Sequence, residues 1–205
     1  MKDTVSHYVP PHSPLTSTEP QVFSNNLTMP PRLRAATAEL HRFDAPISVL
    51  NASTIRPDVV LIIENDELGH TLTADIDDAA IIHGLGSGAP ILGDLQWLTT
   101  ASTVLYWGDI DRAGLSILAT LRRTGVPATA ILMDEITLDR YPQLRHQTDS
   151  QTPSYNIPNG LTATETELYQ RLNAHDQTTE TELQLEQEHI PIVDAVTAIR
   201  SAINR

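Results

Sequence analysis

The chain has 205 residues with no cysteine, and 13 basic against 26 acidic residues give it a formal net charge of -13 at pH 7. The lack of cysteine excludes disulfides and thiolate metal sites, and the acidic balance argues against a protein that grips nucleic acid through a basic surface. No stretch is long and apolar enough for a membrane span, and the N-terminus lacks the apolar core of a secretory signal, so we expect a cytoplasmic protein with no membrane partner. An acidic protein can still act on nucleic acid if its carboxylates hold divalent metals or if a partner supplies the grip.

Residues 1–44 show no sustained hydrophobic period and contain six prolines among Ser, Thr and Asn. We predict a Pro-rich arm or partly disordered lead-in there, with at best a short helix over residues 33–42. Apolar residues begin to recur near Ile47, so residues 45–205 are predicted to form the ordered domain with its C-terminal helices.

The apolar segments of this domain follow one another as strand, glycine-containing loop, strand, helix and strand. Strands are predicted at 59–65, around 81–82, at 102–111 and at 128–134, with a helix at 113–123 that stops before Gly125. This order predicts an α/β fold with a mostly parallel sheet and crossover helices. A polar loop is predicted at 145–160, followed by a helix opening near Leu161 and a closing amphipathic helix starting at Pro191.

Three of the predicted strands end in acidic residues: Glu64, the pair Asp109 and Asp111, and Asp134. Because the carboxyl ends of parallel strands meet at one sheet edge, these side chains can converge there. Asp109 and Asp111 stand two residues apart, which places both on one side of an extended segment, where they repel unless a divalent cation neutralises them. Any one of these acids is explained as well by helix capping, which Asp111 is placed to do, whereas the set favours a metal site.

A glutamate closing one strand and an Asp-x-Asp pair closing a later one resemble the Toprim domain of topoisomerases, primases and nucleases. The segments VLIIEN, GLGSGAPILGDLQWL, YWGDIDRAGLSILATLR, AILMDEITL, LTATETELYQRL and LQLEQEHIP together resemble, in the same order, the JetD C-terminal domain family. The resemblance runs from about residue 47 to 199. It implies a Toprim-like, Rossmann-like sheet flanked by helices.

The resemblance also implies roles for individual residues. Glu64 corresponds to the Toprim glutamate, a general acid or base and metal ligand, while Asp109 and Asp111 correspond to the pair that binds Mg²⁺ or Mn²⁺. Asp134, Glu186 and Glu188 fall in segments typical of the family without a defined role, and the alternative for the LEQE acids is a solvated helix face.

Neighbouring residues are assigned on weaker grounds. Gly108 and Gly114 would let the backbone approach metal and phosphate closely. Arg112 is either a phosphate contact or a surface cation. The histidines are predicted to build no rival metal site, and Trp97 and Trp107 are predicted to lie in the core.

JetD is the nuclease subunit of Wadjet anti-plasmid systems, which work with an SMC-like motor complex. The resemblance therefore implies a dimeric, metal-dependent endonuclease domain. Family members carry a large N-terminal DNA-contacting region, whereas only the Pro-rich arm precedes the domain here, so the chain is either an excised domain or a split or degenerate relative whose partner supplies the DNA grip. Its acidic balance predicts weak DNA binding by itself. Two alternatives stay open. The chain can be a non-catalytic assembly module of such a complex, or a Toprim protein of topoisomerase or primase type, although a topoisomerase needs a nucleophilic tyrosine in a separate domain.

Overall fold

The computed structural model describes residues 26–28, 42–43, 45–72, 76, 79–149, 156–179 and 181–204. The predicted arm lies largely outside this part of the chain, and so does the helix predicted over 33–42 except for Arg42, which belongs to a strand. The boundary at residue 44 between arm and domain stays a prediction.

The central feature is a six-stranded sheet with the order β2-β1-β4-β3-β5-β6. Its strands are β1 Asn26–Thr28, β2 Arg42–Phe43, β3 Val59–Ile63, β4 Ala80–His83, β5 Thr103–Trp107 and β6 Ala128–Ala130. The four strands β4, β3, β5 and β6 are parallel, and β1 and β2 extend the β4 edge in antiparallel pairing. The predicted mostly parallel α/β sheet, Rossmann-like in arrangement, is confirmed.

Strand β3 lies in the middle of the sheet and is buried on both faces. Residues 60–63 are at most 1 % exposed, as expected for a continuous apolar run between two layers of helices. In the parallel register Ile63 lies beside Trp107 of β5, and the amide of Glu64 donates to the carbonyl of Trp107 at 3.1 Å. The residues that follow β3 and β5 are therefore neighbours at the carboxyl edge.

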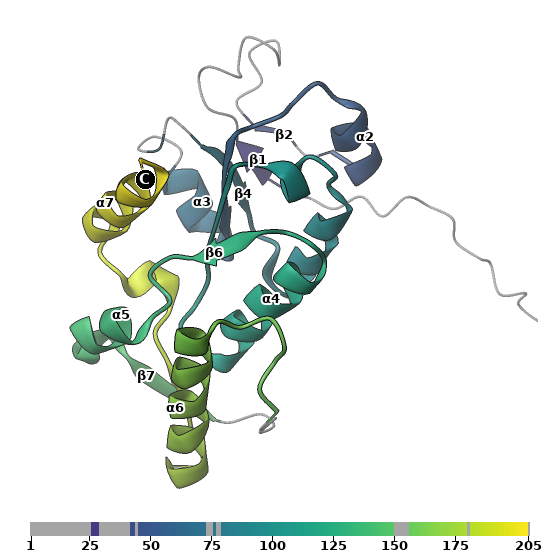
Figure 1. Ribbon diagram of the computed structural model, residues 1–205. Helices are drawn as coiled ribbons and strands as arrows, with labels where there is room; N and C mark the ends of the chain where they lie inside the picture. Colours follow the sequence, from purple (N-terminus) through teal and green to yellow (C-terminus); the bar gives the residue numbers. More distant parts are fainter. Residues whose placement is uncertain are drawn as a thin grey trace, which may run out of the picture.

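Helices cover the sheet on both sides: α2 Ile47–Ala52, α3 Asp66–Leu72, α4 Arg112–Arg123, α5 Glu135–Arg140, α6 Ala163–Thr179 and α7 Ile192–Ile203, with 3-10 turns η1 Gly86–Asp94, η2 Leu98–Thr100, η3 Pro142–Leu144 and η4 Gln187–His189. Figure 1 shows α5, α6 and strand β7 gathered at the end of the molecule opposite α2. None of the helices described here is long and apolar enough to cross a membrane.

Three predicted helices begin within two residues of their predicted starts, and α4 and α6 bury their apolar faces, whereas Val193 on the predicted apolar face of α7 is 72 % exposed. Helix α4 buries Leu115 and Leu118 and ends before Gly125, whose positive φ of 95° suits glycine. Helix α6 opens with a capping box, in which the amide of Thr162 donates to Glu165 at 2.8 Å and the amide of Glu165 donates to the Thr162 hydroxyl at 3.3 Å.

Several predicted boundaries are wrong. The strands predicted over 59–65 and 102–111 end at Ile63 and Trp107, so their acids follow the strands. The predicted loop contains β7, His146–Asp149, which pairs antiparallel with β8, Thr181–Gln184. The strand predicted to reach Asp134 ends at Ala130, because Leu132 has a positive φ of 57° and Asp134 caps α5 by accepting from the amide of Thr137. Both predicted core tryptophans are buried, Trp97 at 4 % and Trp107 at 0 % exposure.

Candidate active site

The ends of β3 and β5 bring Glu64 and Asp109 together. Oε2 of Glu64 accepts from the amide of Asp109 and from the hydroxyl of Tyr106, each at 3.4 Å. We call Glu64, Asp109 and Asp111 the acid centre. Within the described part of the chain, Oε1 of Glu64 and Oδ2 of Asp109 accept no hydrogen bond, so each carboxylate keeps an oxygen available to a ligand.

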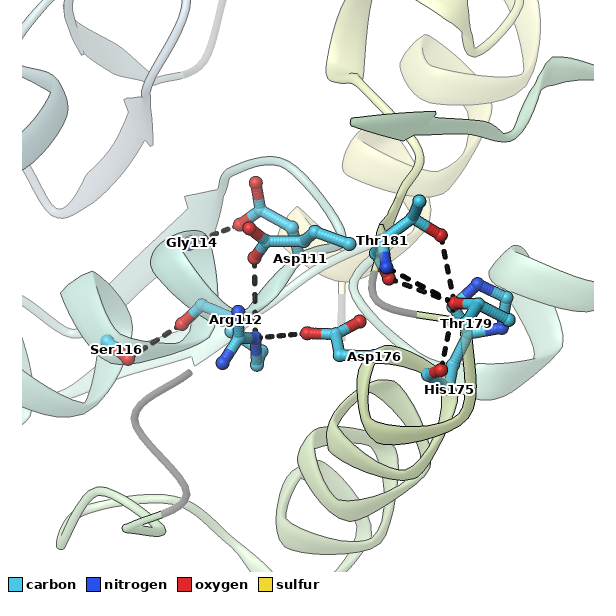
Figure 2. Close-up of polar contacts among 9 residues, drawn as sticks. Asp111, Arg112, Gly114, Ser116, His175, Asp176, Thr179 and Thr181 are labelled. Carbon is cyan, nitrogen blue, oxygen red and sulfur yellow. Dashed lines mark hydrogen bonds and ion pairs between the residues drawn. The ribbon is translucent and has the colours of Figure 1, made fainter. Parts of the chain in front are cut away.

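Asp111 caps α4, as its position suggested, and its second carboxylate oxygen accepts another hydrogen bond. Its Oδ1 caps α4 by accepting from the amide of Gly114 at 2.7 Å, and its Oδ2 accepts from the side-chain amide of Gln184 at 2.8 Å. Figure 2 shows the Asp111 carboxylate beside Gly114 at the start of α4. The two hydrogen bonds fix the orientation of the carboxylate. Capping occupies only Oδ1, because Oδ2 faces a different donor.

Residues 184–187, which we call the closing segment, run along the Asp-x-Asp pair. Leu185 and Ile110 exchange backbone hydrogen bonds of 2.9 and 3.2 Å in an isolated antiparallel bridge. The amide of Gln187 donates to Oδ1 of Asp109 at 2.8 Å. The acid centre is thus held from one side by the sheet and from the other by a segment more than 70 residues later in the chain.

The buried side chain of Gln187 ties the closing segment to both strands. Its amide nitrogen donates to the carbonyl of Trp107 at 2.5 Å, and its oxygen accepts from the amide of Asn65 at 2.9 Å. The bond to Asn65 satisfies an amide beyond the end of β3, and the bond to Trp107 adds a second donor to a carbonyl that already accepts from Glu64.

Gly108 and Gly114 leave no room for a larger residue. A Cβ on Gly108 would lie 2.8 Å from Oε2 of Glu64, and one on Gly114 would lie 2.4 Å from the carbonyl oxygen of Asp109. Their requirement for glycine arises from close packing against the acid centre itself. The predicted contact with phosphate stays a prediction.

Burial and repulsion from neighbouring acids raise the pKa values of all three acids in this centre. Burial, followed by the charges of Asp109 and Asp111, raises the pKa of Glu64 to about 7. Burial also raises the pKa of Asp109 to about 6, with added repulsion from Asp111, Glu188 and Glu186. The pKa of Asp111 is raised as well, again chiefly by burial. Three crowded carboxylates of this kind are costly when ionised, and a divalent cation would remove that cost.

The acid centre has the donor set of a hard cation but not a finished coordination shell. Two oxygens without donors, from Glu64 and Asp109, and the nearby Asp111 carboxylate suit Mg²⁺ or Mn²⁺, which take oxygen ligands and keep water in the remaining positions. However, the carboxylate oxygens of these three residues do not all lie within 4.8 Å of one another, as the ligand atoms do in two other groups of histidines and acids among the described residues. The arrangement therefore fits a cation bound by two of the carboxylates, or bridged to the third by water.

Arg112 lies apart from any open surface. Its Nε is 2.7 Å from Oδ2 of Asp176 on α6 and 3.4 Å from Oε1 of Glu182 on β8, and its side chain is 8 % exposed. Figure 2 shows the guanidinium turned toward Asp176, which reaches it from α6. Arg112 is thus not the surface cation of one interpretation, and this ion pair opposes the other, contact with phosphate, which stays a prediction.

The remaining acids of the sequence prediction differ in their surroundings. Asp134 caps α5 through the amide of Thr137 at 2.7 Å. Glu186 lies between two imidazoles, with Oε1 3.2 Å from Nε2 of His146 and Oε2 3.5 Å from Nε2 of His189. Glu188 is close enough to raise the pKa of Asp109. The alternative of a solvated helix face does not hold for Glu186, which precedes η4, but it fits Glu188, which is exposed in this 3-10 helix.

The prediction that the histidines build no rival metal site stays a prediction, but the described histidines are not scattered as the sequence suggested. The fold assembles one group from Asp66, His70 and His83, and another from His146, Glu186 and His189. His146 lies in a segment predicted as loop, so its distance to residues 186–189 could not be foreseen.

Gln184, Gln187 and Tyr106 contact the acid centre but were not among the predicted site residues. Leu183 and Leu185 alternate with Gln184 and Glu186 in LQLEQ, a pattern typical of a strand. That alternation was the available signal. It predicts a strand but not the strand end that this segment covers.

The chain matches a known protein family. A family model described as Wadjet protein JetD, C-terminal, matches residues 19–199. No curated protein matches the chain.

Proposed function

Since the chain belongs to the JetD C-terminal family and is thereby a Wadjet defence-system subunit, we propose that it is the Toprim-like, metal-dependent DNA endonuclease domain of such a system. The observation that carries this proposal is the acid centre, where three carboxylates lie close together after two adjacent strands, with Asp111 buried and Glu64 and Asp109 half-buried. The pKa of Glu64 rises to about 7 and that of Asp109 to about 6. Shifts of this size are common in catalytic sites and rare among acids with a purely structural function.

We assign Glu64, Asp109 and Asp111 as the residues that would hold Mg²⁺ or Mn²⁺. Such ions, when bound, activate water and stabilise the charge on a scissile phosphate and its leaving oxygen. The closing segment orients the carboxylates, since Gln187 fixes Oδ1 of Asp109 and Gln184 fixes Oδ2 of Asp111. Asp111 is also held as the cap of α4, and Asp109 as the acceptor of the Gln187 amide, so both side chains are in place before substrate arrives.

Glu64 is the residue suited to move a proton. With a pKa of about 7, its carboxyl can accept or release a proton near neutral pH, which is the condition for general acid or base chemistry. The hydroxyl of Tyr106 and the amide of Asp109 hold the same oxygen, Oε2, and leave Oε1 toward the ligand side.

The DNA grip is assigned to partner subunits. A net charge of -13 opposes the binding of a polyanion, so we propose that the SMC-like complex presents the duplex and that two copies of the chain act on its two strands as a homodimer.

The test is plasmid cleavage by the assembled complex. Asp109→Asn keeps the shape of the side chain but removes its charge, and we expect cleavage to fall at least 100-fold, in line with the loss of a principal electrostatic contact. Asp139→Asn, an exposed acid on α5 paired with Arg171, is the matched control and should cleave as the wild type does. Full cleavage by the Asp109 variant would remove the acid centre from the reaction.

The assembly-module alternative makes a different prediction. A carboxylate set without catalytic function need not bind a cation, so Mn²⁺ or Mg²⁺ should then leave the unfolding temperature unchanged. The endonuclease proposal expects stabilisation by Mn²⁺ that Asp109→Asn abolishes.

A further inference from the structure

We infer that His146, Glu186 and His189 form a second metal site, specific for Zn²⁺ and distinct from the acid centre. These three side chains place one ligand atom each within 4.8 Å of the other two. They come from two parts of the chain that are distant in sequence, the start of β7 and the turn η4, which meet because β7 pairs with β8.

The spacing matches tetrahedral zinc. With Zn–N and Zn–O bonds of about 2.0–2.1 Å, ligand atoms on a tetrahedron stand about 3.3 Å apart. Nε2 of His146 is 3.2 Å from Oε1 of Glu186, and Nε2 of His189 is 3.5 Å from Oε2. The two imidazoles approach different oxygens of Glu186, so a shared ion would need the carboxylate to bind through both oxygens or to turn one of them toward both imidazoles, whose ligand nitrogens lie within 4.8 Å of each other.

The ligand chemistry separates this site from the acid centre. Two imidazoles and one carboxylate suit Zn²⁺, whereas a set of carboxylates alone suits Mg²⁺. The side chains are between 31 % and 43 % exposed, so an ion can enter from solvent and a water can complete the fourth position.

A zinc ion here would act on the acid centre through the backbone. Glu186 and His189 flank Gln187, whose amide holds Asp109. Joining η4 to β7 would fix the turn that presents this amide. Glu186 is thereby assigned to the zinc site and not to the catalytic metal.

The experiment is a Zn²⁺ titration of the metal-stripped chain against a chromogenic chelator, with Mg²⁺ in large excess to occupy the acid centre. We expect one equivalent of tightly bound Zn²⁺. His146→Gln and His189→Gln should each weaken binding at least about tenfold, because even outer-shell partners of a metal contribute that much. X-ray absorption of the zinc complex should show two imidazole ligands.

Three controls locate the ion. His175→Gln changes a histidine of α6 that contacts Gln147 of β7 but is not one of the three ligands. His70→Gln changes a member of the other group, which consists of Asp66, His70 and His83. Asp109→Asn removes a carboxylate of the acid centre. All three should bind Zn²⁺ as the wild type does. Since this inference does not rest on nuclease activity, Zn²⁺ binding by Asp109→Asn separates failure of one proposal from failure of the other.

Absence of a bound equivalent in the wild type would overturn the inference, as would binding that survives both His146→Gln and His189→Gln or that disappears with His70→Gln or Asp109→Asn. If His146→Gln reduces the folded fraction, His189→Gln carries the test, because its side chain is 43 % exposed and its loss leaves β7 and β8 paired.

Discussion

At the scale of single residues, the acid centre is unfavourable for the fold when its carboxylates are ionised without a cation. Folding raises the pKa of Glu64 from 4.5 to about 7, so between these values the folded chain binds more protons than the unfolded chain. Stability is therefore lost as the pH rises through this range, by roughly 3 kcal/mol for a shift of this size.

We expect Glu64→Gln to remove most of this pH dependence. The metal-free wild type should lose stability between pH 5 and about 7.5, and the variant should be the more stable protein at the alkaline end. Glu167→Gln, an exposed glutamate of α6, should keep the slope of the wild type. Chemical denaturation at a series of pH values measures this, and an unchanged slope in Glu64→Gln would show that Glu64 ionises normally.

At the scale of elements, α6 is joined to α4 by charges that water scarcely reaches. Arg112 and Asp176 form an ion pair with side-chain exposures of 8 % and 2 %, and Glu182 of β8 lies 3.4 Å from the same Nε. A buried pair of this kind specifies how elements dock more than it stabilises them. It also sits directly after Asp111, so the docking of α6 bears on the position of the acid centre.

Removing one partner should therefore be worse than removing both. Asp176→Ala should cost about 3–5 kcal/mol of unfolding free energy by leaving a buried guanidinium, whereas Arg112→Met with Asp176→Leu should be close to neutral. Asp139→Ala breaks the exposed pair with Arg171 and should change stability little. Urea unfolding compares the three. If Asp176→Ala matches Asp139→Ala, the pair is effectively solvated.

Elements were predictable from the sequence where burial imposes a pattern. The apolar runs of β3 and β5 and the helical spacing of Leu115 and Leu118 identified a parallel sheet and its crossover helix. Strand β7 was missed because HQTD has no apolar residue and its pairing with β8 depends on residues about 35 positions later. The same gap concealed the closing segment and the histidine cluster. The convergence of Glu64 with Asp109 could be predicted, because the carboxyl ends of parallel strands lie at the same edge of a sheet.

At the scale of the whole molecule, the negative net charge opposes the approach of DNA to the acid centre. A surface with a net charge of -13 repels DNA, although the proposed reaction requires a phosphate to enter the acid centre. We expect the isolated chain to bind duplex DNA more weakly than about 10⁻⁴ M near physiological salt, below ordinary non-specific binders. Fluorescence anisotropy with labelled duplex measures this, with the assembled complex as the positive control. Micromolar binding by the chain alone, weakening steeply with salt, would reveal a basic surface that composition does not indicate.

The closing segment has a consequence for the order in which the protein is made. Asp109 and Asp111 leave the ribosome long before Gln184 and Gln187, which lie 73 and 78 residues further on. Until then the Asp109 carboxylate lacks its backbone donor, and the edge beside Ile110 is open. A nascent chain released early therefore carries the acids without their geometry. The acid centre therefore reaches its full geometry only after the closing segment has been made.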